Sequence, residues 1–266
     1  MNKSILKAAA IGMLSAAVLS ACTKSSTGRN QIMLFSEAEL SKMGSQSFEE
    51  LKKKEKISND RALNNYVQCV ANAVTKQVPS TVHAGNWEVV VFDSKQVNAF
   101  ALPGGKIGVY TGILDVAKGQ DQLAAIIGHE IGHVIEHHSN ERLSANQLAQ
   151  VGLTLTAVAL ESTEIENKRL IQVGAAFGVQ YFGIMPYSRG HESEADIVGQ
   201  DLMAQAGFKP NAAISLWQNM AKVSKGAPPE FLSTHPSNQT RINALSEHLS
   251  VSQAKYNASV RPNCKR

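Results

Sequence analysis

The order of polar and apolar positions along this chain predicts helices on both sides of a short region of strands. Ser36 and Glu39 have the spacing of a helix capping box, which predicts a helix from there to about residue 54. A second helix is expected over residues 59–78, and the β-branched run 87–92 is typical of a strand. Residues 97–110 predict a hairpin with a tight turn at Pro103-Gly104-Gly105. Beyond it the pattern is helical, so the predicted fold class is α+β, mostly helical with one small β-sheet.

Residues 121–138 show the apolar spacing of a helix that packs against a core. This helix contains the sequence His129-Glu130-Ile131-Gly132-His133. Positions i and i+4 share a helix face, so the two imidazoles can reach one metal ion, and Glu130 lies beside them to take a proton from bound water. The motif therefore predicts a catalytic zinc site.

Zinc held by two histidines needs a third protein ligand and an open position for water. His137 follows His133 by four residues, but three turns of one straight helix cannot surround a tetrahedral ion. Residues 136 and 139 are Glu and Ser, which excludes the metzincin pattern with its Gly and His at those places. We therefore interpret His137 and His138 as outer or surface groups and look for the third ligand downstream.

The downstream segment Ser-Arg-Gly-His-Glu-Ser-Glu-Ala-Asp-Ile-Val-Gly, residues 188–199, resembles the corresponding segment of the M48 family of zinc metallopeptidases. The segments 98–114 and 233–242 resemble the same family, and all of these matches follow in the family's order over about residues 95–245. The resemblance implies a zincin-type metalloprotease fold, with the small sheet near the active-site helix, and one zinc ion per chain.

Carried over residue by residue, the resemblance makes Glu192 the third zinc ligand beside His129 and His133. Glu194 is the rival, but on a helix the two carboxylates point in nearly opposite directions, so both cannot face the metal. Asp196 lies one turn beyond Glu192 and would orient a ligating imidazole. Arg189 is expected to pair with Asp196 or with a neighbouring carboxylate.

His235 has two functional interpretations. It either stabilises the oxyanion formed during peptide hydrolysis, and is then catalytic, or it reaches the zinc and holds the enzyme inactive, as the resemblance also allows. Arg241 is expected to fix the loop that carries His235. Asn98, Ala99 and Phe100 are expected at an exposed strand edge, where an extended substrate could add as a further strand.

The N-terminus predicts a lipoprotein signal peptide over residues 1–21. Lys3 and Lys7 precede an apolar run too short for a membrane span, which needs about 20 residues. The following Leu19-Ser20-Ala21-Cys22 resembles the bacterial lipobox, in which the cysteine receives lipid. Residue 23 is Thr rather than Asp, which by resemblance to enterobacterial lipoproteins favours the outer membrane, with the protein facing the periplasm.

The remaining cysteines predict a disulfide, and the balance of charges excludes one class of partner. With Cys22 assigned to lipid, Cys69 and Cys264 remain as a pair in an oxidising compartment, which predicts a disulfide. Two of the 26 basic side chains lie in the leader, which leaves 24 against 22 acidic ones and no basic cluster. Nucleic acid is therefore not an expected partner.

Two further apolar segments, 149–160 and 170–185, are shorter than a membrane span. We expect them to be buried core helices, with a surface that rests on lipid or client protein as the alternative. The domain organisation is then the leader, a lipid-anchored tether and N-terminal helix over residues 22–55, with residues 23–35 as the tether, and a protease domain over residues 56–266.

These features together predict a membrane-anchored zinc metalloendopeptidase. By the resemblance, its substrates are damaged or misassembled proteins of the bacterial envelope, and its further partners are other envelope proteases or assembly factors. The alternative is a lipoprotein chaperone that binds client proteins with little cleavage.

Overall fold

The computed structural model describes residues 22–161, 185–223, 231, 235 and 239–266, and the chain divides into two compact units. One unit is formed by Glu37–Glu136 with Arg189–Arg266, and the other by Met1–Ser36 with His137–Ser188. Helices dominate both, and the strands are short, so the predicted α+β class is confirmed.

The first of these units contains the predicted sheet. Its helices are α2 (Glu37–Lys54), α3 (Arg61–Thr75), α4 (Ile113–Val116), α5 (Gln120–Ile135), α9 (Asn211–Val223), α11 (Gln239–Asn257) and most of α8 (Met185–Gln205). Its strands are β3 (Glu88–Phe92), β4 (Ala99–Leu102) and β5 (Lys106–Tyr110), in the order β3-β5-β4. Strand β5 pairs parallel with β3 and antiparallel with β4, which confirms the predicted hairpin. Its turn uses the positive φ angles of Gly104 and Gly105, 87° and 72°, which side chains disfavour.

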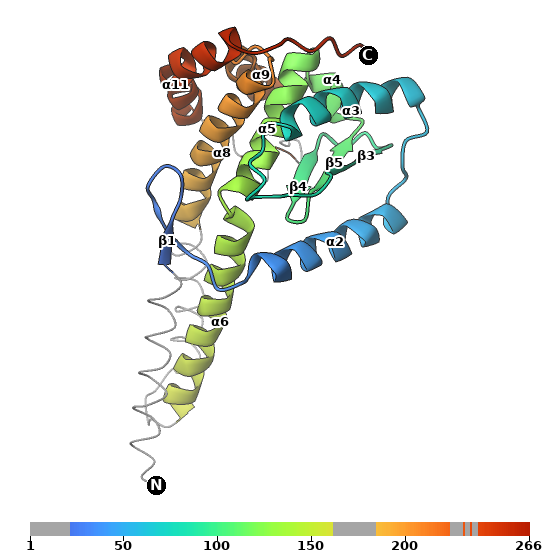
Figure 1. Ribbon diagram of the computed structural model, residues 1–266. Coiled ribbons are helices and arrows are strands. Elements are labelled where there is room, and N and C mark those ends of the chain that lie inside the picture. Colours follow the sequence, from blue (N-terminus) through green and yellow to red (C-terminus); the bar gives the residue numbers. More distant parts are fainter. Residues whose placement is uncertain (1–21, 162–184, 224–230, 232–234, 236–238) are drawn as a thin grey trace. The chain divides into compact units, whose positions relative to one another are not determined.

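Side chains alternate between the two faces of this sheet, as expected for strands. On one face, residues such as Val91 and Val109 pack with the buried sides of α3 and α5. On the other face, Phe92 and Tyr110 pack around Phe48 of α2. Figure 1 shows α2 and α3 on opposite sides of the strands. The sheet is thus the middle layer of this unit.

Helix α5 holds the most buried stretch of the chain. Leu123, Ile126, Ile127 and Ile131 are all fully buried, and the helix packs against α3, α9 and β4. It ends at Ile135 rather than at the predicted residue 138. His137 has a φ angle of 54°, a left-handed conformation that interrupts the helix, and so His137 does not share a face with His133.

The C-terminal tail is fastened to this unit. Cys264 forms a disulfide with Cys69 of α3 across a sequence separation of 195 residues. Beside it, the amide of Cys264 donates to the side chain of Gln120, which in turn donates to the carbonyl of Pro262. Gln120 is the first residue of α5, so the tail lies against the beginning of that helix.

In the other unit, the segment 23–35 expected as a tether contains regular structure that was not predicted. Strands β1 (Cys22–Lys24) and β2 (Asn30–Ile32) pair antiparallel, and the side chains of Arg29 and Gln31 both bond to Glu141 of α6 (His138–Glu161). The buried carboxylate of Glu141 needs such partners, because an unpaired buried charge is costly. The segment is thus a folded hairpin attached to a helix.

Residues 149–160 are helical as predicted, within α6, but the predicted burial is wrong for the part that can be judged. Between residues 149 and 155 no side chain is buried, and Leu155 is 57% exposed. The second apolar segment, 170–185, lies outside the described residues except for Met185. Within the described part of the chain, no helix combines the length and apolarity that a bilayer span requires.

Candidate metal centre

The backbones of α5 and α8 lie unusually close together, and glycine makes this possible. A β-carbon at Gly132 would lie 2.7 Å from the carbonyl oxygen of Ala195, and one at Gly128 would lie 2.7 Å from that of Gly199. Such distances are below any ordinary contact, so both positions of α5 have to lack a side chain. The close approach lets a glutamate side chain on α8 reach the histidines of α5.

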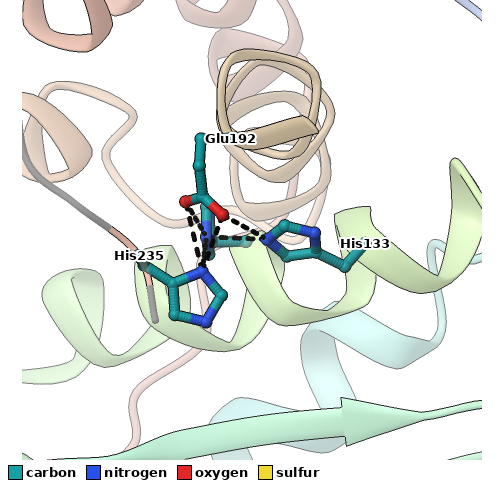
Figure 2. A group of neighbouring side chains, drawn as sticks. His133, Glu192 and His235 are labelled. Atoms are coloured by element: carbon teal, nitrogen blue, oxygen red, sulfur yellow. Dashed lines mark hydrogen bonds and ion pairs between the residues drawn. The ribbon is translucent and has the colours of Figure 1, made fainter. Parts of the chain in front are cut away.

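Three residues predicted as ligands and one predicted loop histidine come together at this contact. Figure 2 shows Glu192 reaching from α8 toward His133 of α5, with His235 beside them. The Nε2 atom of His129 lies 3.1 Å from Nε2 of His133, 3.2 Å from Nδ1 of His235 and 3.3 Å from Oε2 of Glu192. Nδ1 of His235 lies 3.0 Å from Oε1 of Glu192.

These separations suit a small tetrahedral ion. Bonds of about 2.0–2.1 Å around tetrahedral zinc put neighbouring donor atoms about 3.3 Å apart. The donor atoms of His129, His133, Glu192 and His235 all lie within 4.8 Å of one another, so the cluster could hold a metal ion. Glu194 is not a member of this cluster, although it lies only two residues from Glu192.

The electrostatics of the cluster show how strongly these groups depend on each other. Burial alone would lower the pKa of His129, but hydrogen bonds to Asp196 and Glu192 outweigh it and raise the pKa to about 9. Burial alone would raise the pKa of Glu192, but its bonds to His129 and His235 hold that pKa far below the usual value. Without a cation, His129 therefore tends to hold a second proton in its place.

Asp196 occupies the position expected of a group that orients a ligand. Its Oδ1 atom lies 3.0 Å from Nδ1 of His129, and the guanidinium of Arg241 bonds to both of its oxygens at 2.6 and 2.7 Å. Burial would raise the pKa of Asp196, but the charge of Arg241 outweighs it and lowers the pKa. Asp196 is thus an anion that can accept the Nδ1 proton of His129 and leave Nε2 free for a metal.

The partner of Asp196 is Arg241 and not Arg189, whose side chain is exposed. Arg241 is almost completely buried, and it also reaches the carbonyl of His235 at 3.4 Å, which agrees with the loop-fixing role expected for it. No sequence pattern predicted the ion pair between Arg241 and Asp196, although Arg241 lies in the 233–242 segment that resembles the M48 family. Nothing in the sequence marked Trp217 and Phe231, which pack beside His129 with ring centroids 5.6 and 6.3 Å away.

Glu130 is buried next to the cluster without being part of it. Its side chain is about 5% exposed, and its Oε1 atom has no hydrogen bond within the described structure. Nε2 of His235 lies 3.6 Å from that oxygen. Burial raises the pKa of Glu130, and His235 and His129 work against this rise. A buried carboxylate oxygen without a hydrogen bond is costly, which suggests that it serves a molecule that is not part of the chain.

The predicted substrate-binding edge lies on β4, an edge strand. The carbonyl of Asn98 accepts a hydrogen bond from the amide of Tyr110 in β5. Main-chain groups alternate in direction along a strand, so those of the neighbouring residues Val97 and Ala99 point away from β5. On that outer side, the carbonyl of Val97 accepts a bond from the amide of Phe231. Of the three residues predicted to meet substrate, Ala99 is therefore the one whose main chain points to the outer edge.

A helix with two histidines one turn apart, joined by a carboxylate from a second helix, defines the zincin type of metallopeptidase architecture. Residues 61–249 match Peptidase family M48, and the chain belongs to that family. The mitochondrial metalloendopeptidase OMA1 of Schizosaccharomyces pombe is 38% identical over 65% of this chain and 50% of its own length. The mitochondrial metalloendopeptidase OMA1 of Arabidopsis thaliana is 31% identical over 85% of this chain and 45% of its own length.

A bacterial relative is also found. The beta-barrel assembly-enhancing protease of Yersinia pestis is 27% identical over 74% of this chain and 42% of its own length. The chain thus spans about half the length of the curated relatives it matches.

Proposed function

We propose that this chain is a zinc metalloendopeptidase, in which His129, His133 and Glu192 hold the ion. The observation that carries the proposal is the set of donor-atom separations of 3.1 to 3.4 Å among these three residues. Imidazole nitrogens and one carboxylate oxygen are ligands typical of catalytic zinc. Membership of a peptidase family supports the same conclusion.

When bound, zinc would lower the pKa of a water molecule and polarise the carbonyl of the scissile peptide bond. The role of Glu130 follows from its place one residue after His129, outside the ligand cluster. Its carboxylate takes a proton from the attacking water and passes it to the leaving amine. Asp196 holds the Nδ1 proton of His129, so that Nε2 keeps its lone pair.

We assign His235 the role of a fourth zinc ligand in a resting state whose metal site is closed to water. Its Nδ1 atom lies 3.0 to 3.2 Å from donor atoms of Glu192 and His129, the separation expected of a fourth ligand. In that position the imidazole takes the place that a water molecule needs. The amide of Phe231, four residues before His235, bonds to the carbonyl of Val97 at the outer edge of β4. Hydrolysis would require the imidazole of His235 to move away from the ligand atoms.

The substrate is proposed to be an extended polypeptide that binds along the outer edge of β4 at Ala99. Main-chain bonds to a strand edge ignore side-chain identity, which suits a protease of broad specificity. Damaged or misassembled envelope proteins are the proposed substrates. The Yersinia pestis relative, a beta-barrel assembly-enhancing protease, supports this choice of substrate class.

The proposed location is the outer membrane, facing the periplasm, through lipid on Cys22. The support is the leader and the Leu19-Ser20-Ala21-Cys22 sequence. Replacing Cys22 by Ser should release the mature protein from the membrane fraction. Persistent association of this variant with membranes would contradict the lipid anchor and point to another attachment.

Casein digestion with and without a chelator tests the enzymatic function. The Glu130→Gln variant should keep the zinc and lose activity by about 100-fold or more, the usual scale for a general base. A client-binding lipoprotein with little cleavage, the alternative function, has no need of a buried carboxylate at this place. Digestion by this variant at the wild-type rate would contradict the mechanism, and no digestion by the wild-type protein would favour the alternative.

A further inference from the structure

Trp217 of α9 contacts two charged groups beside the metal-binding cluster, Asp196 and Arg241. Its indole Nε1 donates to Oδ1 of Asp196 at 3.2 Å, and its side chain is almost completely buried. The guanidinium carbon of Arg241 lies 3.7 Å from the centroid of the Trp217 ring. A buried cation over an indole face is attracted by the ring quadrupole. One side chain thus holds Asp196 by a hydrogen bond and Arg241 by its ring.

These contacts bear on the proton of His129. The same Oδ1 atom of Asp196 faces Nδ1 of His129 at 3.0 Å, while an amino nitrogen of Arg241 lies 3.4 Å from that Nδ1. Arg241 can only donate, so a guanidinium that moved onto Nδ1 would require the imidazole proton to be on Nε2. A protonated Nε2 has no lone pair for a metal. A guanidinium held on Asp196, beside the indole ring, therefore favours the tautomer of His129 that carries its proton on Nδ1.

We infer that Trp217 is a positioning residue for the metal ligand His129. It fixes the carboxylate of Asp196 and keeps Arg241 on that carboxylate, so that His129 keeps its proton on Nδ1 and presents Nε2. Trp217 also packs against the His129 ring, with centroids 5.6 Å apart, and its polar contacts reach His129 through these two residues. The inference rests on the proposed metal site and deepens it.

The substitution Trp217→Phe tests this, because phenylalanine retains an aromatic ring and lacks the indole N–H. The chain offers a matched control, since it contains two tryptophans, and Trp87 packs on His83 away from the cluster. Both single variants and the wild-type protein are titrated with zinc in competition with a chromogenic chelator, at a temperature where thermal melts show all three folded. Trp217→Phe should weaken zinc binding by about 10-fold or more, the usual effect of losing a group that supports a ligand, and Trp87→Phe should leave it unchanged.

A second measurement does not require altering Trp217. In the Trp87→Phe protein, the remaining indole N–H resonance in a ¹⁵N-correlated NMR spectrum belongs to Trp217. Zinc should shift this resonance and slow its hydrogen exchange, because a fixed imidazole orders Asp196. The inference is overturned if the wild-type protein binds zinc but Trp217→Phe binds it with the same affinity, or if zinc leaves the indole resonance unchanged. In either case the proposed function still stands. Wild-type protein that binds no zinc overturns the proposed function and this inference with it.

Discussion

Gly132 of α5 faces the backbone of Ala195 on α8 so closely that a β-carbon on Gly132 would lie 2.7 Å from the carbonyl oxygen of Ala195. Gly132 is also the residue before His133 in the metal-binding motif. The helix that carries two histidines can therefore approach the helix that carries Glu192 only because this position has no side chain. The distance between the helices, more than the motif itself, sets the geometry of the cluster.

Replacing Gly132 by Ala should push the two helices apart. We expect a loss of about 1–3 kcal/mol in the free energy of unfolding, the usual cost of overpacking, and weaker zinc binding, because Glu192 moves away from His129. Thermal melts and zinc titrations measure both. The control is Gly152→Ala in α6, where a β-carbon meets no atom of the described residues within 4 Å and the helix should gain up to about 1 kcal/mol. Unchanged zinc affinity in the Gly132→Ala variant would show that the close approach is not required.

Glu192→Gln should lower zinc affinity by at least about 100-fold, more than the loss of an outer group costs, because the anionic ligand is removed. Glu194→Gln should retain the metal, since Glu194 is not in the cluster. Metal content after dialysis, measured by atomic absorption, compares the two proteins. Retention in the Glu192→Gln variant with loss in the Glu194→Gln variant would show that Glu194 is the ligand.

His235→Ala should open the fourth position of the metal site. The protein should keep its zinc through the three remaining ligands, and casein cleavage should rise by about 10-fold, as expected when a closed state that holds about nine in ten molecules is removed. Binding of a small hydroxamate should tighten for the same reason. His248→Ala is the control, because His248 bonds to Asp201 and not to the cluster. A large fall in cleavage would instead assign His235 to oxyanion stabilisation.

Replacing both Cys69 and Cys264 by Ser should lower thermal stability without removing the metal. A native disulfide in a secreted domain contributes about 2–5 kcal/mol, and this one also holds the tail beside Gln120. Differential scanning calorimetry with and without zinc measures the loss, and reduction of the wild-type protein should reproduce it. Two free thiols in protein alkylated before cell lysis would contradict the bridge.

Local sequence patterns were sufficient for most of the fold. The capping box at Ser36, the β-branched strand that ends at Phe92 and the Gly104-Gly105 turn each act over a few residues, and the structure has the predicted elements at these places. The failures concern polar or apolar segments whose partners are distant. Residues 22–32 form a hairpin, for which Glu141, far along the chain, supplies a partner at Arg29. No local pattern contains that information.

The sequence by itself determined the chemistry of the centre, since the spacing of His129 and His133 on one helix fixes their common face, and Glu192 and Asp196 are one turn apart in the same way. Only the tertiary structure decided what surrounds them. The ion pair of Arg241 with Asp196, the packing of Trp217 beside His129 and the place of Nδ1 of His235 among the ligand atoms all depend on tertiary packing. They arise from how α8, α9, α11 and His235 come together with α5. Helical periodicity acts over a few residues, whereas these contacts join positions tens of residues apart, and packing of the whole core brings them together.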